Sequence, residues 1–491
     1  MTTLAHPPVT GTRRWAGLAV LAASLLVVVV DMTVLNVALP EITLAVDAGP
    51  VAQLWIVDAY SLVLAGLLVP VAAIADRWGR RRTLLCGFTL FGAASAAVVL
   101  AETPGAVIAI RLALGVGGAM IMPATLSLLR ALFPDPTERA FALGIWSATA
   151  AAGAALGPLV GGLLLEVFGW HAAFLVNVPI MAVAVVAGWC LLPESRSERP
   201  GRVDATGVLL SLTTMSALVF AAKHVGEAGV DLVAAGLVAL GTGAGVAFVR
   251  RCLRQPDPML AVRLFGDRVF RAGVITALVS SVALTALLLV GAQWLQLVRG
   301  FSPLTAGVAL LPLALGGLVG PPLAPALARR VGVRPVLVGG LLALALGMLI
   351  LVALPRPMSY AGVGVALLVV GVGTAALGLA SALIMGAAPE HEAGSAAAVE
   401  EMSYEIGAVL GVSVLGSAAG AVYRAGLPAD APAIVGDSVG HALGTSFAAA
   451  ASEAFTVGFA AVGLLGGLAA LAAAVVVHRQ LPADLDLSLE H

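Results

Sequence analysis

Fourteen long apolar stretches divide this chain, and they restrict its fold more than any other feature of the sequence. They lie at 16–38, 51–71, 84–101, 105–128, 140–164, 172–192, 204–222, 230–249, 270–296, 303–326, 335–354, 358–385, 394–422 and 454–477. A helix needs roughly 20 apolar residues to cross the hydrocarbon of a bilayer, so each stretch predicts one membrane-spanning helix. Only 11% of the 491 residues are charged, which leaves no sizeable aqueous domain. We predict an all-α, multi-pass protein of the cell (inner) membrane with 14 transmembrane helices.

Positive charge is distributed unevenly between the loops. When the loops are counted from a cytoplasmic N-terminus, 21 of the 26 Lys and Arg residues fall on the cytoplasmic side and four fall outside. This bias follows the positive-inside rule and favours an even number of helices. Arg13 and Arg14 precede a first helix that has no cleavage pattern, so that helix is expected to be retained. Both termini are therefore predicted to be cytoplasmic.

One short segment occurs twice in the chain. Residues 73–84 (AIADRWGRRRTL) resemble residues 326–337 (ALARRVGVRPVL), and the two segments lie in loops that are eight helices apart. Two six-helix bundles separated by an inserted helix pair would produce that spacing. We predict these parts at 1–15 (cytoplasmic N-terminus), 16–192 (first bundle), 193–269 (linkers and inserted pair), 270–477 (second bundle) and 478–491 (cytoplasmic C-terminus). Transporters with parallel repeats bind their substrate between the two halves.

The sequence lacks the motifs of an enzyme or of an ATP-driven pump. Lys223 is the only lysine, and no Gly-Lys-Ser/Thr loop is present to hold a phosphate. The histidines show no metal-ligand spacing, and we find no catalytic triad. We therefore expect no enzyme activity, no cofactor, no metal and no ATP or nucleic-acid partner. We also expect the chain to act as a monomer.

Six charged residues lie inside the predicted spans and more than two residues from either end: Asp31, Asp58, Arg111, Glu400, Glu401 and Glu405. A charged group in a bilayer span costs a few kcal/mol or more, so each one suggests a functional site. Glu401 and Glu405 are four residues apart and therefore share one helix face. Two such carboxylates in a low dielectric cannot both be ionised cheaply, and they can exchange a proton for an organic cation. The alternative for Glu400 is a solvated helix end.

Arg111 and two tyrosines in the spans point to the same chemistry. The guanidinium of Arg111 keeps its proton and needs partners inside the membrane, unless it reaches the interface as a snorkelling side chain. Tyr60 and Tyr404 lie two and three residues from Asp58 and Glu401, where their rings can face a bound cation. Membrane aromatics also serve packing, and that alternative remains open for both tyrosines.

Two loop and helix motifs predict moving parts. In the first repeated loop, the Asp76, Arg77, Gly79, Arg80 and Arg81 pattern combines a tight reversal with acid–base pairing, so we predict a gating latch; the alternative is a simple positive anchor. The fifth predicted span carries a second set of gating candidates: Gly153, Gly157, Pro158, Gly161 and Gly162. Glycines at spacing four let helices approach closely, and proline bends a span.

These motifs carry a resemblance to a known family. The 76–82 loop resembles the signature loop of the major facilitator superfamily, and the 153–162 segment resembles the antiporter motif of its exporters. The segment that begins at Arg111 is similar to the family's helix-4 motif, in which the arginine is linked to proton transfer. Residues 31–40 (DMTVLNVALP) and 170–179 (WHAAFLVNVP) resemble motifs of the 14-helix drug:proton antiporters.

Within that family, residues 55–62 and 396–405 look most like exporters of quaternary ammonium compounds and cationic dyes of the QacA, SmvA and LfrA type. The resemblance implies that Asp31, Asp58, Glu401 and Glu405 match acids used for proton coupling or cation binding. We assign proton coupling to these four acids and Arg111, and substrate binding to Asp58, Tyr60, Glu400, Glu401 and Tyr404. We expect a proton-coupled multidrug efflux antiporter that works by alternating access. The alternatives are a dedicated exporter of one natural product and, in another class, a membrane sensor that transports nothing.

Overall fold

A computed structural model of the chain describes residues 11–48, 50–197, 205–229, 231–437, 439–442, 444–482 and 485. A few side chains within its helices, including those of Asp58 and Pro158, are outside the described part. All regular elements in the described part are helices, and thirteen helical spans there are long and apolar enough to cross a membrane. The predicted span 140–164 falls in one continuous helix of 33 residues that is not among the thirteen.

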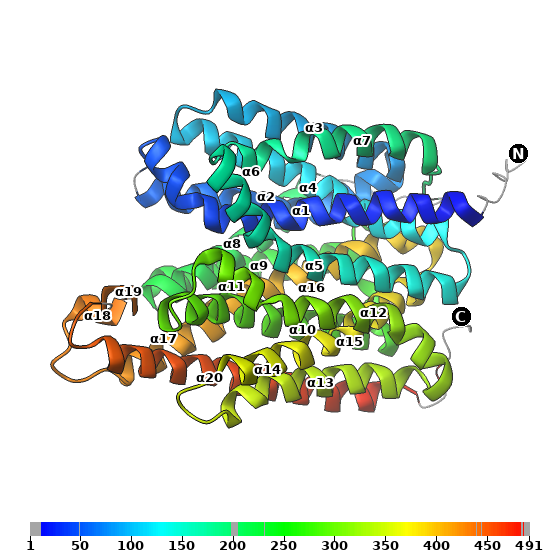
Figure 1. Ribbon diagram of the computed structural model, residues 1–491. Coiled ribbons are helices and arrows are strands. Elements are labelled where there is room, and N and C mark those ends of the chain that lie inside the picture. Colours follow the sequence, from blue (N-terminus) through cyan, green and yellow to red (C-terminus); the bar gives the residue numbers. More distant parts are fainter. Residues whose placement is uncertain are drawn as a thin grey trace, which may run out of the picture.

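The first predicted bundle is built from long helices that pack as neighbours out of sequence order (Figure 1). Its elements are α1 (Gly11–Ala45), α2 (Pro50–Trp78), α3 (Arg80–Ala96), η1 (Ala97–Leu100), α4 (Pro104–Leu132), α5 (Pro136–Phe168), α6 (Ala172–Leu175) and α7 (Asn177–Leu191). Capping starts α4 and α5: the side chains of Thr103 and Asp135 accept backbone N–H groups, and proline follows each. Helix α1 packs on α5 and α7, and α4 packs on α2 and α3.

The predicted inserted pair is a helical hairpin, α8 (Ala205–Ala228) and α9 (Leu232–Arg254), which packs on α2 through α8. Asp231 begins α9 by accepting the N–H of Ala234 over 2.8 Å, and its other oxygen lies 2.8 Å from His224 Nε2. These hydrogen bonds, the backbone one foremost, lower the pKa of the Asp231 carboxyl.

The rest of the chain repeats the long-helix pattern with more interruptions. Its elements are η2 (Val262–Gly266), α10 (Arg268–Gln293), η3 (Trp294–Val298), α11 (Pro303–Ala309), α12 (Leu311–Val331), α13 (Val333–Ala353), α14 (Tyr360–Gly373), α15 (Ala375–Ala387), η4 (Glu390–Glu392), α16 (Ala393–Leu410), η5 (Gly411–Gly416), α17 (Ser417–Ala425), α18 (Ala433–Asp437), α19 (Val439–Ala442) and α20 (Ala448–Gln480). Both η3 and η5 are π-helical, so α10 and η3 form one span, and α16, η5 and α17 form another.

The internal repeat is visible in the backbone. Gly79 between α2 and α3 has φ 128°, and Gly332 between α12 and α13 has φ 94°. These glycines occupy the same position of the repeated segment, and both adopt a conformation that residues with a side chain rarely take. The repeat therefore specifies the same reversal in two loops, but the acid at Asp76 is replaced by Arg329 in the second loop.

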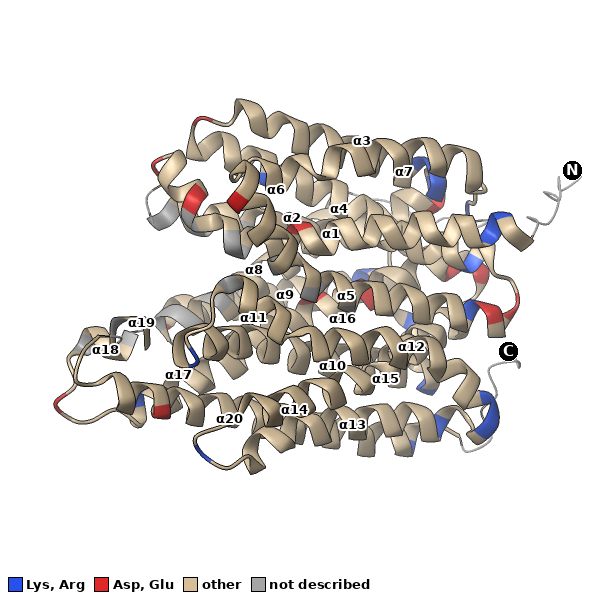
Figure 2. Ribbon diagram, viewed as in Figure 1, with Lys and Arg blue, Asp and Glu red and all other residues tan. Residues whose placement is uncertain are grey.

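Helices from the first and second predicted bundles pack against each other in two places. Helix α5 packs on α12 and α15, and α16 packs on α2 and α4. Where α5 meets α12, a Cβ added to Gly144 would lie 2.5 Å from the carbonyl oxygen of Pro321, so only glycine permits this approach. Helix α1 begins and α20 ends at the same end of the bundle, called here the terminal end (Figure 1). Most Lys and Arg residues lie towards that end (Figure 2).

Candidate functional site

Asp31 and Arg111 form an ion pair in the interior of the helix bundle. Arg111 Nη1 of α4 lies 3.0 Å from Asp31 Oδ2 of α1, and both side chains are 2% exposed. Arg111 also donates from Nε to the carbonyl of Ile56 over 3.1 Å. A buried guanidinium must be balanced by an anion and by acceptors, and here α1 supplies the anion and α2 supplies the carbonyl acceptor. Arg111 therefore does not snorkel to the interface, which was the alternative for this residue.

Tyr60 of α2 completes this arrangement from below the guanidinium. Its ring centroid is 4.5 Å from the central carbon of Arg111, within the range of a cation–π contact. The Tyr60 hydroxyl is buried and has no hydrogen-bond partner among the described residues. It lies beside Gly118 of α4, where an added Cβ would approach it to 2.9 Å. The cation that Tyr60 faces in this structure is thus the resident Arg111.

Asn177 is a member of the same cluster that the sequence did not single out. Its side-chain Nδ2 donates to Asp31 Oδ1 over 2.8 Å and to Ser95 Oγ over 3.2 Å. Asn177 is 1% exposed and opens helix α7. The signal was present, because Asn177 belongs to the 170–179 motif, but the sequence alone does not reveal which span it contacts.

Three acids and a tyrosine form a second cluster on α16, separate from the one around Asp31. Glu400 and Glu401 are fully buried and Glu405 is nearly so, which excludes a solvated helix end for Glu400. The Tyr404 hydroxyl donates to Glu400 Oε1 over 3.0 Å, one helical turn away. Both oxygens of Glu401 lack a hydrogen-bond partner among the described residues. An ionised carboxylate in that position would be costly, so Glu401 requires either a proton or a cation.

Close packing places these acids deep in the bundle. An added Cβ at Gly407 would lie 2.6 Å from the carbonyl oxygen of Leu278, and one at Gly411 would lie 2.5 Å from that of Val282. The two glycines therefore let α16 run directly along the backbone of α10. Ser281 of α10 donates to the Tyr404 carbonyl over 2.7 Å.

The Asp31–Arg111 cluster and the acids of α16 lie on helices that pack against each other. Helix α16 packs on α2 and α4, which carry Tyr60 and Arg111. Trp146 of α5 has its ring 6.5 Å from that of Tyr404, so an aromatic pair joins α5 to α16 next to Glu400. Asp58, the remaining predicted acid, lies on α2, but its side chain is outside what the structure describes.

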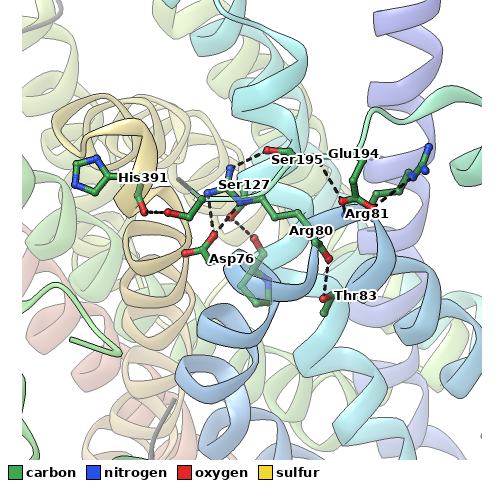
Figure 3. Close-up of polar contacts among 11 residues, drawn as sticks. Asp76, Arg80, Arg81, Thr83, Ser127, Glu194, Ser195 and His391 are labelled. Carbon is green, nitrogen blue, oxygen red and sulfur yellow. Dashed lines mark hydrogen bonds and ion pairs between the residues drawn. The ribbon is translucent and has the colours of Figure 1, made fainter. Parts of the chain in front are cut away.

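The predicted latch residues form a network at the terminal end. Arg80 pairs with Asp76 over 2.8 Å and donates to Ser195 Oγ over 3.1 Å (Figure 3). Arg81 donates its backbone N–H to Glu194 over 3.2 Å and its side chain to the Leu192 carbonyl over 3.1 Å. The segment 192–197, called here the strap, therefore runs across the loop between α2 and α3. Arg77 is exposed.

The strap and the latch also touch the second half of the chain. The backbone N–H of Ser197 donates to the Asp76 carbonyl over 3.0 Å, and its hydroxyl donates to the His391 carbonyl over 2.7 Å. The Asp76 carboxylate lies against Gly394, where any Cβ would overlap it. A carboxylate at the first turn of α16 is favourable because of the helix dipole. Arg130 of α4 donates to the carbonyls of Met385 and Ala388, at the end of α15.

Comparison with known proteins identifies the architecture. Residues 21–412 match the family model described as the Major Facilitator Superfamily. The chain belongs to the Major Facilitator Superfamily. It is 39% identical over 485 residues to the multidrug efflux pump LfrA of Mycolicibacterium smegmatis, covering 95% of this chain and 96% of that protein. It is 37% identical over 407 residues to the methyl viologen resistance protein SmvA of Salmonella typhimurium, covering 82% of each.

A solved superfamily structure has the same fold. The human organic anion transporter MFSD10 (TETRAN) superposes with a TM-score of 0.61 at 16% identity, over 95% of this chain and 100% of that one. The predicted family is confirmed by the family model and by LfrA. The predicted all-α class is confirmed for the part of the chain that the structure describes. As a member of the Major Facilitator Superfamily, the chain is a multi-pass cell membrane protein of a transporter family.

The glycines of the α5 motif differ in how closely their neighbours pack. Gly153 and Gly161 face Val29 and Val34 of α1, and a Cβ at either would lie 3.0–3.1 Å from those side chains. A Cβ at Gly157 would overlap Thr33, also on α1. Gly162 has open space instead, with no neighbour within 4 Å of an added Cβ. The close approach of α5 to α1 thus depends on Gly157 most, and the Pro158 side chain is outside the described part.

Proposed function

We propose that this protein exports lipophilic organic cations, such as quaternary ammonium compounds and dyes, in exchange for protons. The names of two relatives, a multidrug efflux pump and a methyl viologen resistance protein, support this class of substrate. The observation that carries the proposal is the burial of acids on both halves, Asp31 on α1 and Glu400 and Glu401 on α16. A buried carboxylate needs a proton or a cation, and those are the two ions that such an antiporter moves.

The topology that we propose has 14 spans, with α5 as the fifth and with both termini in the cytoplasm. The bundles at 16–192 and 270–477 would rock against each other, while the inserted pair follows the first bundle. The concentration of arginine at the terminal end supports a cytoplasmic position for that end (Figure 2).

Proton coupling in this proposal uses the Asp31–Arg111 pair. Arg111 stays protonated, so Asp31 is the member of the pair that takes up and releases a proton. A proton on Asp31 removes the negative charge that holds Nη1 at 3.0 Å, which frees Arg111 to favour its other contacts with Ile56 and Tyr60. The change in one ion pair would thereby alter the packing between α1, α2 and α4.

Cation binding in this proposal uses the α16 cluster. Glu401 and Glu405 share one face. The neighbouring Glu400 bonds to Tyr404, whose ring is 6.5 Å from that of Trp146, so two aromatic faces are available near the cluster. A lipophilic cation that enters this region would replace the protons on these acids, so drug and proton compete. Exchange of one monovalent cation for one proton moves no net charge. The membrane potential, worth about 2.3 kcal/mol per charge per 100 mV, then contributes nothing to the driving force, and the pH gradient alone drives export.

The gate in this proposal is the network of the latch and the strap. Asp76, Arg130 and Ser197 connect the first half to the start of α16 and the end of α15, so the terminal end is held closed in this arrangement. Opening toward the cytoplasm requires these contacts to break together. The closed latch therefore corresponds to the state that faces outward.

Ethidium efflux tests the proposal directly. Cells that express the wild-type chain should extrude ethidium, and a protonophore should stop extrusion. Asp58→Asn should stop it as well, whereas Asp47→Asn, an exposed acid just after α1, should not. Absence of efflux in cells with good membrane expression of the wild type would contradict export of cations. Efflux that survives the protonophore would contradict proton coupling.

A further inference from the structure

We infer that Asn177 is a positioning residue for proton exchange at Asp31, a role that nothing in the sequence motif assigns to it. The inference rests on the proposed proton coupling. It starts from the division of the Asp31 carboxylate between two donors: Oδ1 receives the Asn177 amide over 2.8 Å, and Oδ2 faces Arg111 Nη1 at 3.0 Å. Each oxygen thus has one donor, and the two donors are chemically different.

The two donors respond differently when Asp31 gains a proton. The guanidinium of Arg111 is attracted by the negative charge, so its bond weakens when the charge is removed. The amide of Asn177 is neutral, and it can donate both to a carboxylate oxygen and, more weakly, to the carbonyl oxygen of a carboxylic acid. Asn177 therefore holds Oδ1 in both protonation states. The proton is left to Oδ2, the oxygen that Arg111 occupies.

This division makes each protonation event act on the Arg111 contact. Without Asn177, the carboxyl group could rotate and accept a proton on either oxygen, and Arg111 could keep a contact with the other. With Asn177 in place, binding of a proton and release of Arg111 are the same event. The amide is itself fixed, because it also donates to Ser95 Oγ over 3.2 Å and is 1% exposed.

No other described group competes for this role. Among the described side chains, the charged or titratable groups near Asp31 on the helices packed on α1 are Arg111 of α4 and Tyr60 of α2, whose ring lies against Arg111. In the described part of α5 and α7, no charged side chain bonds to Asp31, and α7 contributes Asn177 alone. Asn177 is also the first residue of α7, so α7 is directly attached to the site of proton exchange.

Infrared titration of the purified full chain in lipid nanodiscs tests the inference without reference to transport. The carboxylic acid band of Asp31 is assigned by its loss in Asp31→Asn and is followed with pH. In Asn177→Leu, which has a similar volume but no donor, ionised Asp31 loses a hydrogen bond. The band should therefore persist to higher pH by about one unit, a tenfold change in proton affinity.

Two additional variants make the outcome unambiguous. Asn177→Ala should give the same shift, and it replaces the first variant if leucine prevents folding. Ser95→Ala removes the second contact of Asn177 but keeps its bond to Asp31, so its titration should match the wild type. Wild-type titration of Asp31 in Asn177→Leu and Asn177→Ala would overturn the inference. Failure of the proposed function would appear elsewhere, as ethidium efflux that is insensitive to protonophore in the wild-type chain.

Discussion

Glu400 and Glu401 are adjacent on α16 but have different surroundings. The Tyr404 hydroxyl donates to Glu400 over 3.0 Å, whereas both Glu401 oxygens lack a partner among the described residues. Successive residues of an α-helix point about 100° apart, so one acid faces Tyr404 and the other does not. Of these two adjacent acids, Glu401 is thus the one that is available to a mobile cation or proton.

Glu401→Gln should weaken cation binding while leaving the fold intact. The amide has the shape of the protonated acid, but it cannot supply the negative charge that a cation needs. We expect ethidium affinity, measured by fluorescence anisotropy with the purified chain, to fall by tenfold or more, since a hydrogen bond or contact with a charged partner is worth about 1.5–3 kcal/mol. Glu390→Gln, in the exposed turn before α16, is the matched control and should bind ethidium normally. Equal affinity of both variants would contradict this assignment.

The Asp31–Arg111 pair should behave as a unit in a double-mutant cycle. Arg111→Leu leaves Asp31 buried without its counter-ion, and the free energy of unfolding should fall by about 3–5 kcal/mol. Addition of Asp31→Asn removes the uncompensated charge and should restore much of that stability, although neither variant should export ethidium. Thermal unfolding of the purified variants measures the cycle. Strictly additive effects of the two substitutions would show that the pair is not coupled.

The glycines of α5 should differ in their tolerance of a side chain. Gly157→Val places atoms into Thr33 of α1, and overpacking of this kind costs about 1–3 kcal/mol. We expect less folded protein and loss of efflux. Gly162→Val, five residues further along the same helix, enters open space and should retain both. Fluorescence-detected size-exclusion chromatography and efflux would check the pair, and similar behaviour of the two variants would contradict the steric argument.

The sequence predicted which residues are unusual but not which of them meet. Asp31, Arg111 and the α16 acids stand out because charge is costly in a bilayer, and that rule needs no structure. Asp31 contacts Arg111 and Asn177, which are 80 and 146 residues further along the chain. Only three-dimensional packing brings their helices together. Glu194 was missed for the same reason, since it lies in a linker whose course the apolar pattern does not specify.

The sequence also predicted the helices better than their exact limits and their close contacts. The predicted span 454–477 is α20, Ala448–Gln480, because a helix continues beyond the apolar part that the pattern detects. Gly144 had no sequence signal, yet it allows α5 to touch Pro321 of α12. The repeated segment has a counterpart in the backbone, since a glycine at the same position of both loops has a positive φ.

Asp231 should stabilise the start of α9 in a pH-dependent way. Its pKa is lowered by the hydrogen bond from Ala234 and by His224, so its contribution is complete above the ordinary value of 3.8 and is lost as the pH falls through the lowered value. At pH 7, Asp231→Ala should speed hydrogen exchange at amides 232–236. At a pH well below 3.8, wild type and variant should exchange alike. Asp430→Ala, in an exposed loop, should change nothing at these amides.

Glu194 should hold the terminal end closed through the strap. It lies 3.9 Å from Arg81 and 3.7 Å from Arg82, and it accepts the backbone N–H groups of Arg81 and Ser195. Glu194→Gln removes the charge that these arginines share, so the strap should detach more often and the terminal end should open more often. Ser127, which lies beside this network and is 2% exposed, reports the opening when it is replaced by cysteine in a background without native cysteines (Figure 3).

In Ser127→Cys, alkylation by a small maleimide should be slow, and Glu194→Gln should accelerate it severalfold because the buried thiol becomes accessible whenever the latch opens. Asp257→Asn, an exposed acid in the other linker of the inserted pair, is the matched control and should leave the rate unchanged. Alkylation at the wild-type rate in Glu194→Gln would mean that Asp76 and Arg130 keep the terminal end closed without the strap. Acceleration by both substitutions would instead indicate a general loosening of the loops rather than release of a specific latch.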